Sequence, residues 1–362
     1  MKIAVIAGDG IGPDVTQAAL AVADAAVKLA KAPKLTRQPI AAGAGYFEQT
    51  GQDIEPGGEE AAGQAAAIFL GAIGLPAIRH PDGTEISPHL RLRERYQLYA
   101  GVRPVRAYPN APQRLADPRA AGIDMVILRE STEGLFYSAA VHGRAEIEGD
   151  AAVNDIMRIT RATTEKLHRF AFQLAARRKA KGKSGKLTCV DKANVFTSQA
   201  FFRKIFDEIK ADHPDVAVDY NYVDAMALDL VRQPWDFDVM VMENIFGDIL
   251  SDLAGGLVGG MGMAACAEIG DEVGLFQPAH GSAPDIMGQD RANPLAAILS
   301  AGLMLDYLSE TTGYSAYALA ADHLDRAVET GFAQNQLRPM EFGGDMGTLA
   351  VTNAVLTALG DA

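Results

Sequence analysis

The sequence predicts an α/β protein with two lobes, in which a sheet is flanked by helices. Short apolar segments of strand length alternate with alanine-rich segments of helical pattern along almost the whole chain, which is typical of this class. The chain has 362 residues, of which 48% are hydrophobic. Because single cores stop growing near ~250–300 residues, we expect two lobes with a core in each.

In the first half of the chain, a strand at residues 3–7 leads through a glycine turn into a helix at residues 13–30. Pro13 suits the first turn of that helix, where its missing N–H group leaves no hydrogen bond unmade. The further elements expected here are a strand at 66–71, a helix opened by Ser87 and Pro88, an extended run at 97–105 and a strand at 124–128.

The second half of the chain continues this alternation. The expected elements are a strand-like piece at 138–141, a long helix at 153–178, strands at 187–190, 216–223 and 237–242, a helix after residue 243 and mostly amphipathic helices after residue 293. No internal repeat or low-complexity tract interrupts this order.

Charge and composition argue against several classes of partner. The net charge is −13 and the pI is about 5.0, which disfavours binding to nucleic acid or to an anionic membrane. No apolar run approaches the ~20 residues of a membrane span, and the first residues lack a signal-peptide cleavage site. The two cysteines, Cys189 and Cys266, give neither a disulfide framework nor a zinc cluster. We therefore expect a cytoplasmic protein.

A basic segment interrupts this acidic chain. Residues 87–129 contain eight arginines, no lysine and only three acidic residues. Arg91 and Arg95 are interpreted as part of a salt-bridged helix face. Arg103 and Arg129 lie in or at the end of strand-like runs instead. Because a guanidinium group binds carboxylates and phosphates through paired hydrogen bonds, the segment predicts an anionic ligand.

The helix expected after residue 243 carries two aspartates, Asp248 and Asp252, four residues apart. Residues at this spacing share one face of a helix. Two like charges there destabilise the helix by a few tenths of a kcal/mol unless a positive group lies between them. A solvated acidic face is the more frequent explanation of such a pair, and a divalent cation held by carboxylate oxygens is the alternative. The spacing alone leaves both interpretations open.

The segment GDGIGP at residues 8–13 lies between a strand and a helix, where a dinucleotide fingerprint would lie. Pro13 stands at the third glycine of the G-x-G-x-x-G pattern, so a tight turn explains the segment equally well. The chain also contains no Walker A motif, no G-x-S-x-G motif and no H-E-x-x-H motif. A metal-dependent phosphotransferase therefore lacks a recognisable phosphate-binding loop.

A series of motifs nevertheless occurs in an order and spacing that resemble one family. The motifs are GDGIGP at 8–13, LR at 92–93, LYA at 98–100 with VRP at 102–104, RESTEG at 129–134, VDKANV at 190–195, VDAM at 223–226, NIFGDILSD at 244–252 and HGSAPD at 280–285. Together they resemble the isocitrate/isopropylmalate dehydrogenase family, the metal- and NAD(P)-dependent β-decarboxylating dehydrogenases, which include tartrate/D-malate and homoisocitrate enzymes. The resemblance runs from about residue 3 to about residue 300. Each motif alone is modest, but the ordered set is very specific.

The resemblance implies a two-lobed isopropylmalate-dehydrogenase-like fold with a mixed central sheet flanked by helices, which is not a true Rossmann fold. Residues 1–99 and 257–362 would form a large cofactor-binding domain, and residues 100–256 a small substrate, metal and dimerisation domain. The implied reaction is the oxidation of a (2R)-2-hydroxy diacid of the malate type by NAD, with loss of the C3 carboxylate as carbon dioxide. A catalytically altered or non-catalytic regulatory homologue is the alternative.

The resemblance also implies roles for individual residues. The arginines that match those holding the substrate carboxylates are Arg93, Arg103 and Arg129. The aspartates that match the ligands of Mg²⁺ or Mn²⁺ are Asp224, Asp248 and Asp252. Lys192 matches the base that takes the hydroxyl proton, and Asp224 also suits a helix N-cap. In the family Lys192 and Asp224 serve the site of the partner subunit, so the implied active unit is a homodimer with shared active sites.

The implied cofactor is NAD. The residues that match the family's cofactor site are Ile11, Asn194, His280, Gly281, Ser282, Ala283, Asp285 and Asn293. An acid at Asp285 suits the free ribose hydroxyls of NAD and would repel the 2′-phosphate of NADP, although capping of the following helix explains an aspartate there as well.

Three departures from the family pattern leave parts of the reaction open. The tyrosine that assists protonation of the enolate is replaced by Phe136, so either a one-residue bulge brings Tyr137 in or the proton donor is missing. Gln277 stands where a glutamate is frequent. His89 and Leu90 lie in the segment that reads the C3 substituent, and a polar group there favours a small or polar substituent. Isopropylmalate-like, tartrate- or malate-like and isocitrate-like substrates all stay open, as does retention of decarboxylation.

Overall fold

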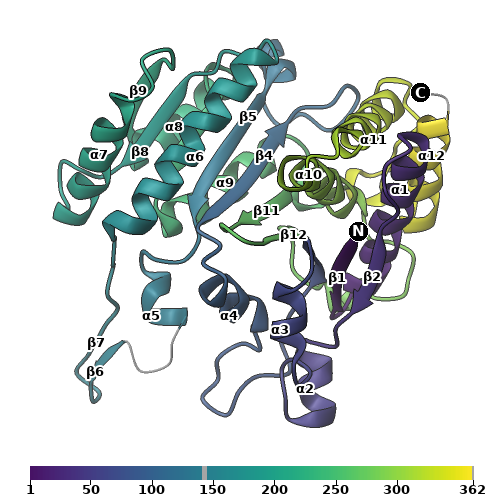
Figure 1. The fold of residues 1–362 in the computed structure, drawn as a ribbon, viewed down its shortest axis with the longest axis horizontal. Coiled ribbons are helices and arrows are strands. Elements are labelled where there is room, and N and C mark those ends of the chain that lie inside the picture. The colour runs from purple at the N-terminus through teal and green to yellow at the C-terminus, as the bar shows by residue number, and fades with distance from the viewer. Residues whose placement is uncertain (141–144, 361–362) are drawn as a thin grey trace. The chain divides into compact units, whose positions relative to one another are not determined.

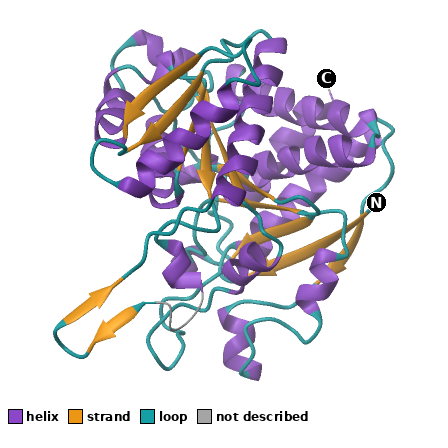
Figure 2. Cartoon of the chain, turned by 60° about the vertical axis from the view of Figure 1, so that its left-hand side comes forward, coloured by secondary structure: helices purple, strands orange, loops and turns teal. Residues whose placement is uncertain are grey.

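A computed structural model of the protein describes residues 1–140 and 145–360 (Figures 1 and 2). The chain divides into two compact units. Unit 1 comprises Met1–Leu92, Tyr108–Pro112 and Gly259–Ala362, and unit 2 comprises Arg93–Ala107 and Gln113–Val258. Both units combine strands of mixed direction with flanking helices, so the predicted α/β class is confirmed. Among the described helices, none has the length and apolar character needed to cross a membrane.

Unit 1 has the strand order β2-β1-β3-β12-β11. The strands are β1 (Lys2–Gly8), β2 (Thr36–Pro39), β3 (Ile68–Ala72), β11 (Ala265–Ile269) and β12 (Gly274–Pro278). β1 runs parallel to β2 and β3, and β12 runs parallel to β3, whereas β11 is antiparallel to β12. The central strand β3 is buried along its whole length, as expected for an uninterrupted apolar strand covered on both faces.

Four long helices accompany the strands of unit 1. They are α1 (Gly12–Leu29), α10 (Leu295–Thr312), α11 (Ser315–Ala333) and α12 (Thr348–Gly360), and α1 packs against the other three. Shorter pieces are α2 (Ala44–Thr50), α3 (Gly58–Gly63) and the 3₁₀ turns η3 (Met261–Met263), η4 (Pro284–Ile286) and η5 (Met340–Phe342). The chain passes from unit 1 to unit 2 within α4 (Pro88–Arg95). Arg91 of α4 forms salt bridges with Asp53 and Glu59.

Unit 2 has the strand order β4-β5-β10-β8-β9. The strands are β4 (Ala100–Arg106), β5 (Asp124–Glu130), β8 (Leu187–Asp191), β9 (Val218–Tyr222) and β10 (Val239–Met242). β4 is antiparallel to β5, and the other neighbours are parallel. The helices are α5 (Phe136–Ala140), α6 (Arg161–Ala180), α7 (Thr197–Lys210), α8 (Val223–Arg232) and α9 (Asn244–Leu257), with the 3₁₀ turns η1 (Pro118–Gly122) and η2 (Pro234–Asp236).

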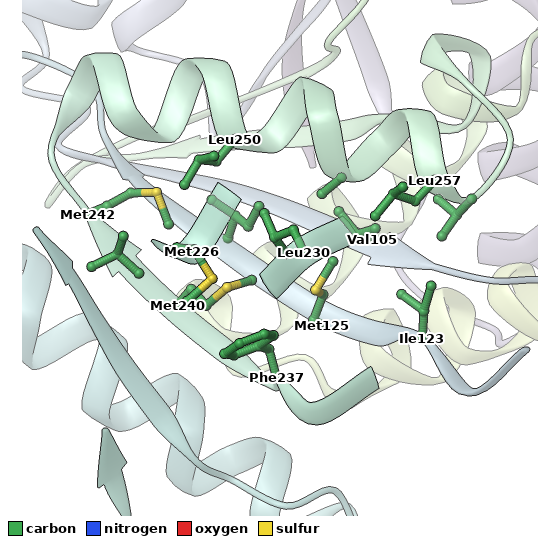
Figure 3. Close-up of a cluster of buried hydrophobic side chains, with 14 of the residues drawn as sticks. Val105, Ile123, Met125, Met226, Leu230, Phe237, Met240, Met242, Leu250 and Leu257 are labelled. Carbon is green, nitrogen blue, oxygen red and sulfur yellow. The ribbon is translucent and has the colours of Figure 1, made fainter. Parts of the chain in front are cut away.

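The apolar core of unit 2 lies between α9 and one face of its sheet (Figure 3). Met125 and Ile127 of β5 contribute to this cluster, as do Met240 and Met242 of β10. These residues alternate along their strands, as side chains on one face of a sheet must. Leu250 projects from α9 into the same cluster and is 2% exposed. The cluster therefore fixes α9 against β5, and this contact positions the polar groups described below.

The sequence prediction of a helix at 153–178 is wrong at its start, because α6 begins at Arg161. Val153 belongs instead to β7 (Ala152–Asn154), which pairs with β6 (Glu146–Glu148) in a hairpin that projects from unit 2 in both views (Figures 1 and 2). Thr160 starts α6, since its hydroxyl accepts a hydrogen bond from the backbone of Thr163. The Glu133 carboxylate holds Thr160 in place through the Thr160 backbone N–H (2.8 Å) and hydroxyl (2.6 Å).

The strand-like piece expected at 138–141 is also wrong for its described part. Residues 136–140 form α5, and Val141 lies outside the described residues. Gly134 has a φ of +69°, a left-handed conformation that turns the chain out of β5. The backbone N–H groups of Tyr137 and Ser138 then bond back to the carbonyl groups of Gly134 and Leu135. This local turn overrides the strand preference of the short apolar run.

Candidate active site

Two buried arginines lie on one face of the sheet in unit 2. Gly101 of β4 is paired with Arg129 of β5, and Arg103 shares the face of Gly101 because it lies two residues farther along the strand. The same face carries the apolar residues Met125 and Ile127. Arg103 and Arg129 are 7% and 2% exposed. Since a buried guanidinium group requires acceptors or a negative partner, this end of the sheet is suited to anions. The third predicted arginine, Arg93, lies in α4 and is also buried.

Helix α9 places carboxylates beside these arginines. Gly247 lets the helix approach closely, because a Cβ atom at this position would lie 2.6 Å from the Cβ atom of Arg129. Glu243 caps the helix by accepting hydrogen bonds from the backbone N–H groups of its first turn. Asp248 forms an ion pair with Arg129, and Asp252 follows one turn later. The shared helix face predicted for the two aspartates is therefore turned toward cationic side chains.

The electrostatics of Asp252 reflect this arrangement. Partial burial raises the pKa of the Asp252 carboxyl, and the negative charge of Asp248 raises it further, whereas the positive charges of Arg103 and Arg129 lower it. The two acids and the two arginines therefore act on one another in one place. A cation bound between the two carboxylates would relieve their repulsion, so the donor chemistry fits a hard divalent ion.

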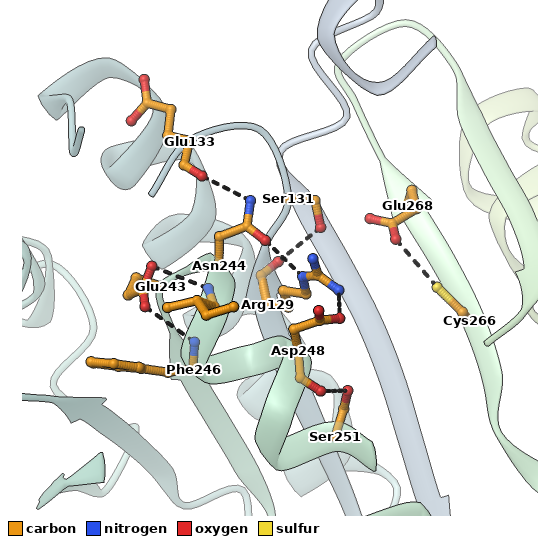
Figure 4. A network of polar contacts seen from close by, with 11 residues as sticks. Arg129, Ser131, Glu133, Glu243, Asn244, Phe246, Asp248, Ser251, Cys266 and Glu268 are labelled. Atoms are coloured by element: carbon orange, nitrogen blue, oxygen red, sulfur yellow. Dashed lines mark hydrogen bonds and ion pairs between the residues drawn. The ribbon is translucent and has the colours of Figure 1, made fainter. Parts of the chain in front are cut away.

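A network of polar contacts also holds Arg129 through its Nε–H group (Figure 4). The Nε–H group of Arg129 donates to Oδ1 of Asn244 (2.8 Å), and the Nδ2 amide of Asn244 donates to the carbonyl oxygen of Glu133 (2.9 Å). Asn244 is fully buried. Sequence reasoning did not single out Asn244, because its partners lie more than a hundred positions away along the chain.

Lys192 and Asp224 form a second polar pair in unit 2. The Nζ atom of Lys192 lies 2.5 Å from an Oδ atom of Asp224, and the Asp224 side chain is 68% exposed. This hydrogen bond to Lys192 lowers the pKa of Asp224. Asp224 lies in the first turn of α8, where a negative charge is also favoured by the helix dipole. The pair thus places the predicted base and one predicted metal ligand together at the surface.

The residue before Lys192 is anchored by an arginine that sequence reasoning missed. Asp191 is fully buried, and its carboxylate accepts hydrogen bonds from Nε (2.7 Å) and Nη2 (2.8 Å) of Arg203 on α7. The same carboxylate accepts from the backbone N–H group of Ala193 (2.8 Å). Two hydrogen bonds from a planar guanidinium group fix both partners. Asp191 therefore holds the turn that carries Lys192.

The three predicted metal ligands are not gathered within one chain. Across residues 1–140 and 145–360, no group of three or more His, Cys, Asp or Glu side chains is placed to hold a metal ion. Asp248 and Asp252 share α9, whereas Asp224 is paired with Lys192. One chain therefore offers two carboxylates at one place and a lysine–aspartate pair at another.

In unit 1, three loops at the ends of strands are tied together. The backbone N–H group of Ile11 donates to the carbonyl of Ser282 (2.8 Å), and the Ser282 hydroxyl donates to the carbonyl of Gly74. Gly10 has a φ of +57°, and a Cβ atom there would lie 2.0 Å from the Ser282 carbonyl oxygen, so only glycine fits. The buried carboxylate of Asp9 accepts hydrogen bonds from the backbone N–H groups of Ala44, Gly45 and Gly74. Asp9 therefore holds these segments together, a role that the sequence alone did not indicate.

Two further predicted cofactor residues of unit 1, Asn293 and His280, interact with an unpredicted acid, Glu341. One carboxylate oxygen of Glu341 accepts from Nδ2 of Asn293 (2.9 Å), and the other accepts from the N–H group of Gly262 (3.1 Å). Burial lowers the pKa of His280, and the charge of Glu341 opposes that effect. The side of the HGSAPD loop that faces solvent carries Gly281, Ala283 and Asp285, which are all exposed. No side chain caps the 3₁₀ turn η4, so the alternative role of Asp285 as a helix cap is not observed. Asn194, also exposed, lies in unit 2 between β8 and α7.

Phe136 and Tyr137 occupy different surroundings. The guanidinium carbon of Arg129 lies 4.8 Å from the centre of the Phe136 ring. The guanidinium carbon of Arg158 lies 4.8 Å from the centre of the Tyr137 ring. Since α5 begins at Phe136, consecutive side chains there point in directions about 100° apart. The structure therefore places a phenyl ring against the candidate substrate arginine.

Comparison with known proteins decides the family. The family model described as isocitrate/isopropylmalate dehydrogenase matches residues 2–358. The chain belongs to the isocitrate/isopropylmalate dehydrogenase family. This result confirms the resemblance inferred from the motifs.

Members of this family with known names or structures match nearly the whole chain. The 3-isopropylmalate/3-methylmalate dehydrogenase of Methanocaldococcus jannaschii is 40% identical over 98% of this chain and 97% of its own length. The 3-isopropylmalate dehydrogenase of Aquifex aeolicus is 36% identical over 99% of this chain and 97% of its own length. Among solved structures, isocitrate dehydrogenase from Methylococcus capsulatus superposes with a TM-score of 0.84 at 33% identity, covering 99% of both chains. A β-decarboxylating dehydrogenase from Thermococcus kodakarensis gives 0.79 at 34% identity, covering 99% of this chain and 96% of its own.

Proposed function

We propose that this protein oxidises a (2R)-2-hydroxy diacid of the malate type with NAD and a divalent cation, and releases the C3 carboxylate as carbon dioxide. Membership of the family and the names of its relatives support oxidative decarboxylation of a hydroxy acid. The observation that carries the proposal is the placement of two buried arginines and two aspartates around one end of the sheet in unit 2.

In this proposal the arginines bind and orient the substrate. A malate-type diacid carries two negative charges, and guanidinium groups bind carboxylates through paired hydrogen bonds. Arg103 and Arg129 are held on adjacent strands, so they would fix the carboxylates with little loss of side-chain freedom. Arg93, buried in α4, would supply the third positive charge. Orientation by several fixed groups exposes C2 to a hydride acceptor.

The proposed ligands of the cation, Mg²⁺ or Mn²⁺, are Asp248 and Asp252 together with Asp224 of a second copy of the chain. The chemistry supplied by a bound divalent cation is polarisation of the substrate oxygens at C1 and C2. Lys192, hydrogen-bonded to Asp224 (2.5 Å), would take the hydroxyl proton onto its Nζ atom when that atom is in its neutral amine form. Asp191 and Arg203 would keep Lys192 in position through the turn that they anchor.

A second copy would complete the site, which makes the proposed active unit a homodimer. Asp224 and Lys192 lie at the surface of one chain, and Leu228 and Val231 of α8 are exposed nearby in sequence. Ile249 is exposed on α9 between the two candidate metal ligands. A contiguous patch of exposed apolar side chains marks a surface that a partner covers, and in this proposal α8 and α9 supply such a patch. Ile147 and Val153 of the β6–β7 hairpin are likewise exposed.

For the cofactor, we propose that NAD binds at the tied loops of unit 1. The contact between Ile11 and Ser282 brings the GDGIGP turn to the HGSAPD loop, and Asn293 is fixed by Glu341 (2.9 Å). The exposed carboxylate of Asp285 favours NAD over NADP, because it would accept from ribose hydroxyls and repel a 2′-phosphate. Two buried cysteines are in keeping with the proposed cytoplasmic location.

The proposed substrate class comprises 3-isopropylmalate, tartrate or D-malate, and isocitrate-like compounds. One observation favours a second candidate function, a catalytically altered homologue. The ring beside Arg129 belongs to Phe136, which has no proton to give to the enolate. In such a homologue oxidation would proceed while protonation of the enolate left by decarboxylation is slowed.

The test is a substrate panel. The purified protein is incubated with Mg²⁺ or Mn²⁺, with NAD or NADP, and with D-malate, tartrate, 3-alkylmalates, isocitrate or homoisocitrate, and both NADH and carbon dioxide are measured. At least one diacid is expected to give NADH, and Asp248→Asn is expected to abolish this activity. Absence of turnover across the whole panel with either cofactor would refute the proposed function.

Complementation tests the shared site. Lys192→Ala and Asp248→Asn are each expected to be inactive. When the two variants are unfolded and refolded together, mixed dimers contain one site with neither substitution, so activity is expected to return. Activity that stays absent in the mixture, while refolded wild-type protein is active, would refute sharing of the site between copies.

A further inference from the structure

Asn244 is placed to control one of the proposed substrate arginines. Its side chain is fully buried at the first residue of α9. Oδ1 accepts a hydrogen bond from Nε of Arg129 (2.8 Å), and Nδ2 donates one to the carbonyl oxygen of Glu133 (2.9 Å). Figure 4 shows the amide between these two groups. Both ends of the Asn244 amide are therefore engaged.

The loop that carries the Glu133 carbonyl group is held by several hydrogen bonds. The Glu130 carboxylate accepts hydrogen bonds from the backbone N–H groups of Thr132 and Glu133, both 2.7 Å long. The Glu133 carboxylate in turn binds the hydroxyl of Thr160 at the start of α6 (2.6 Å). The carbonyl group of Glu133, which accepts the hydrogen bond from the Asn244 amide, is thus held in place by Glu130 and by Thr160.

We propose that Asn244 is a positioning residue that sets the rotation of the Arg129 guanidinium group toward a substrate carboxylate. The inference rests on the proposed function of Arg129. With Nε held by Asn244, Nη1 of Arg129 is directed to Asp248, one turn farther along α9. Because a guanidinium group is planar, fixing Nε fixes the plane in which the other N–H groups can bind an anion.

Two substitutions separate positioning from support of the fold. Asn244→Asp keeps the size of the side chain but replaces the amide donor with a second oxygen, and the helix dipole favours the added negative charge at the start of α9. The carbonyl oxygen of Glu133 repels this carboxylate, so the carboxylate no longer holds the Nε–H group of Arg129 in the observed orientation. Its charge also offsets the positive charge of Arg129. Asn244→Leu has a similar size but leaves the Nε–H group without its acceptor, which destabilises a buried group. The two variants therefore have different expected effects on stability but the same expected effect on substrate binding.

The experiment compares wild-type protein, Asn244→Asp, Asn244→Leu and the control Ser251→Ala. Ser251 lies on the same helix and is buried, but its hydroxyl bonds to the backbone carbonyl of Asp248. For each protein, kcat and KM for D-malate, or for whichever diacid of the panel wild-type protein oxidises, are measured with NAD and Mg²⁺. The rise in melting temperature on adding that diacid and Mg²⁺ without NAD gives a binding readout that needs no turnover.

Both Asn244 variants are expected to raise KM about 10- to 100-fold, the scale of one lost hydrogen bond between Arg129 and a charged substrate carboxylate. They should also lose most of the diacid-induced rise in melting temperature, whereas Ser251→Ala should match wild type. A KM and a melting-temperature rise within about twofold of wild type in Asn244→Asp would overturn the inference, even if Asn244→Leu does not fold. Wild-type protein that neither oxidises nor binds any diacid would refute the proposed function, and the inference with it.

Discussion

The buried carboxyl group of Glu130 should make the stability of this protein depend on pH in a way that a single substitution removes. Burial raises the pKa of Glu130 from 4.5 to about 7, although hydrogen bonds from Thr132 and from the backbone of Glu133 act in the opposite direction. The change to test is Glu130→Gln, which has the same shape and does not titrate.

The sign and size follow from the two pKa values. Between pH 4.5 and about 7 the folded protein holds a proton on Glu130 that the unfolded chain has released. The free energy of unfolding therefore falls as pH rises through this range, and the stabilising contribution of Glu130 is fully present only below pH 4.5. At about 1.4 kcal/mol per pKa unit, the difference between the folded and unfolded pKa values of Glu130 corresponds to about 3 kcal/mol of unfolding free energy.

The assay is urea unfolding of wild-type protein and Glu130→Gln from pH 5 to pH 8. Other groups titrate in both proteins, so the difference between the two free energies of unfolding isolates Glu130. The wild type should lose about 2–3 kcal/mol relative to the variant over this range. In Glu130→Gln, the side-chain amide N–H group faces the backbone N–H group of Glu133, so that hydrogen bond is lost. This change lowers the free energy of unfolding of the variant by about 1–3 kcal/mol at every pH. Two free-energy curves that stay parallel from pH 5 to pH 8 would refute this reasoning.

Three further predictions concern single side chains. Phe136→Tyr should raise the amount of decarboxylated keto acid formed per NADH, because it puts a hydroxyl beside Arg129 that can protonate the enolate. Tyr137→Phe should leave that ratio unchanged, and a ratio that falls in Tyr137→Phe would make Tyr137 the proton donor. Leu250→Ala should lower the free energy of unfolding by about 2–5 kcal/mol through a cavity in the core of unit 2. Arg203→Leu should lower it by about 3–5 kcal/mol, because it leaves the buried Asp191 carboxylate without two charged hydrogen bonds. Urea unfolding measures both, and a loss below about 1 kcal/mol would contradict either prediction.

The sequence was sufficient for features that local pattern determines. The alternation of apolar strands and helices predicts the α/β class, and the i,i+4 spacing of Asp248 and Asp252 places both on α9. Arg103 and Arg129 were singled out because arginine is unusual in strand-like runs. Their common face on adjacent strands follows from the register of β4 and β5, which the sequence does not reveal.

Contacts between distant segments could not be predicted. The start of α6 was misplaced because Thr160 is held by Glu133, 27 positions earlier. Asn244 and Glu341 likewise act through partners that no local pattern links to them. Asn244 and Glu341 hold residues of the candidate sites in place through side-chain hydrogen bonds. In the sequence they are ordinary polar residues with nothing that marks this role.

The central claim is that a divalent cation, bound at Asp248 and Asp252, is required to oxidise a 2-hydroxy diacid. The most direct test measures NADH and carbon dioxide together from the preferred diacid, before and after removal of divalent cations with a chelator. We expect NADH formation to stop with the chelator and to return when Mg²⁺ or Mn²⁺ is restored. NADH formation that continues at the same rate in metal-free protein would contradict the account.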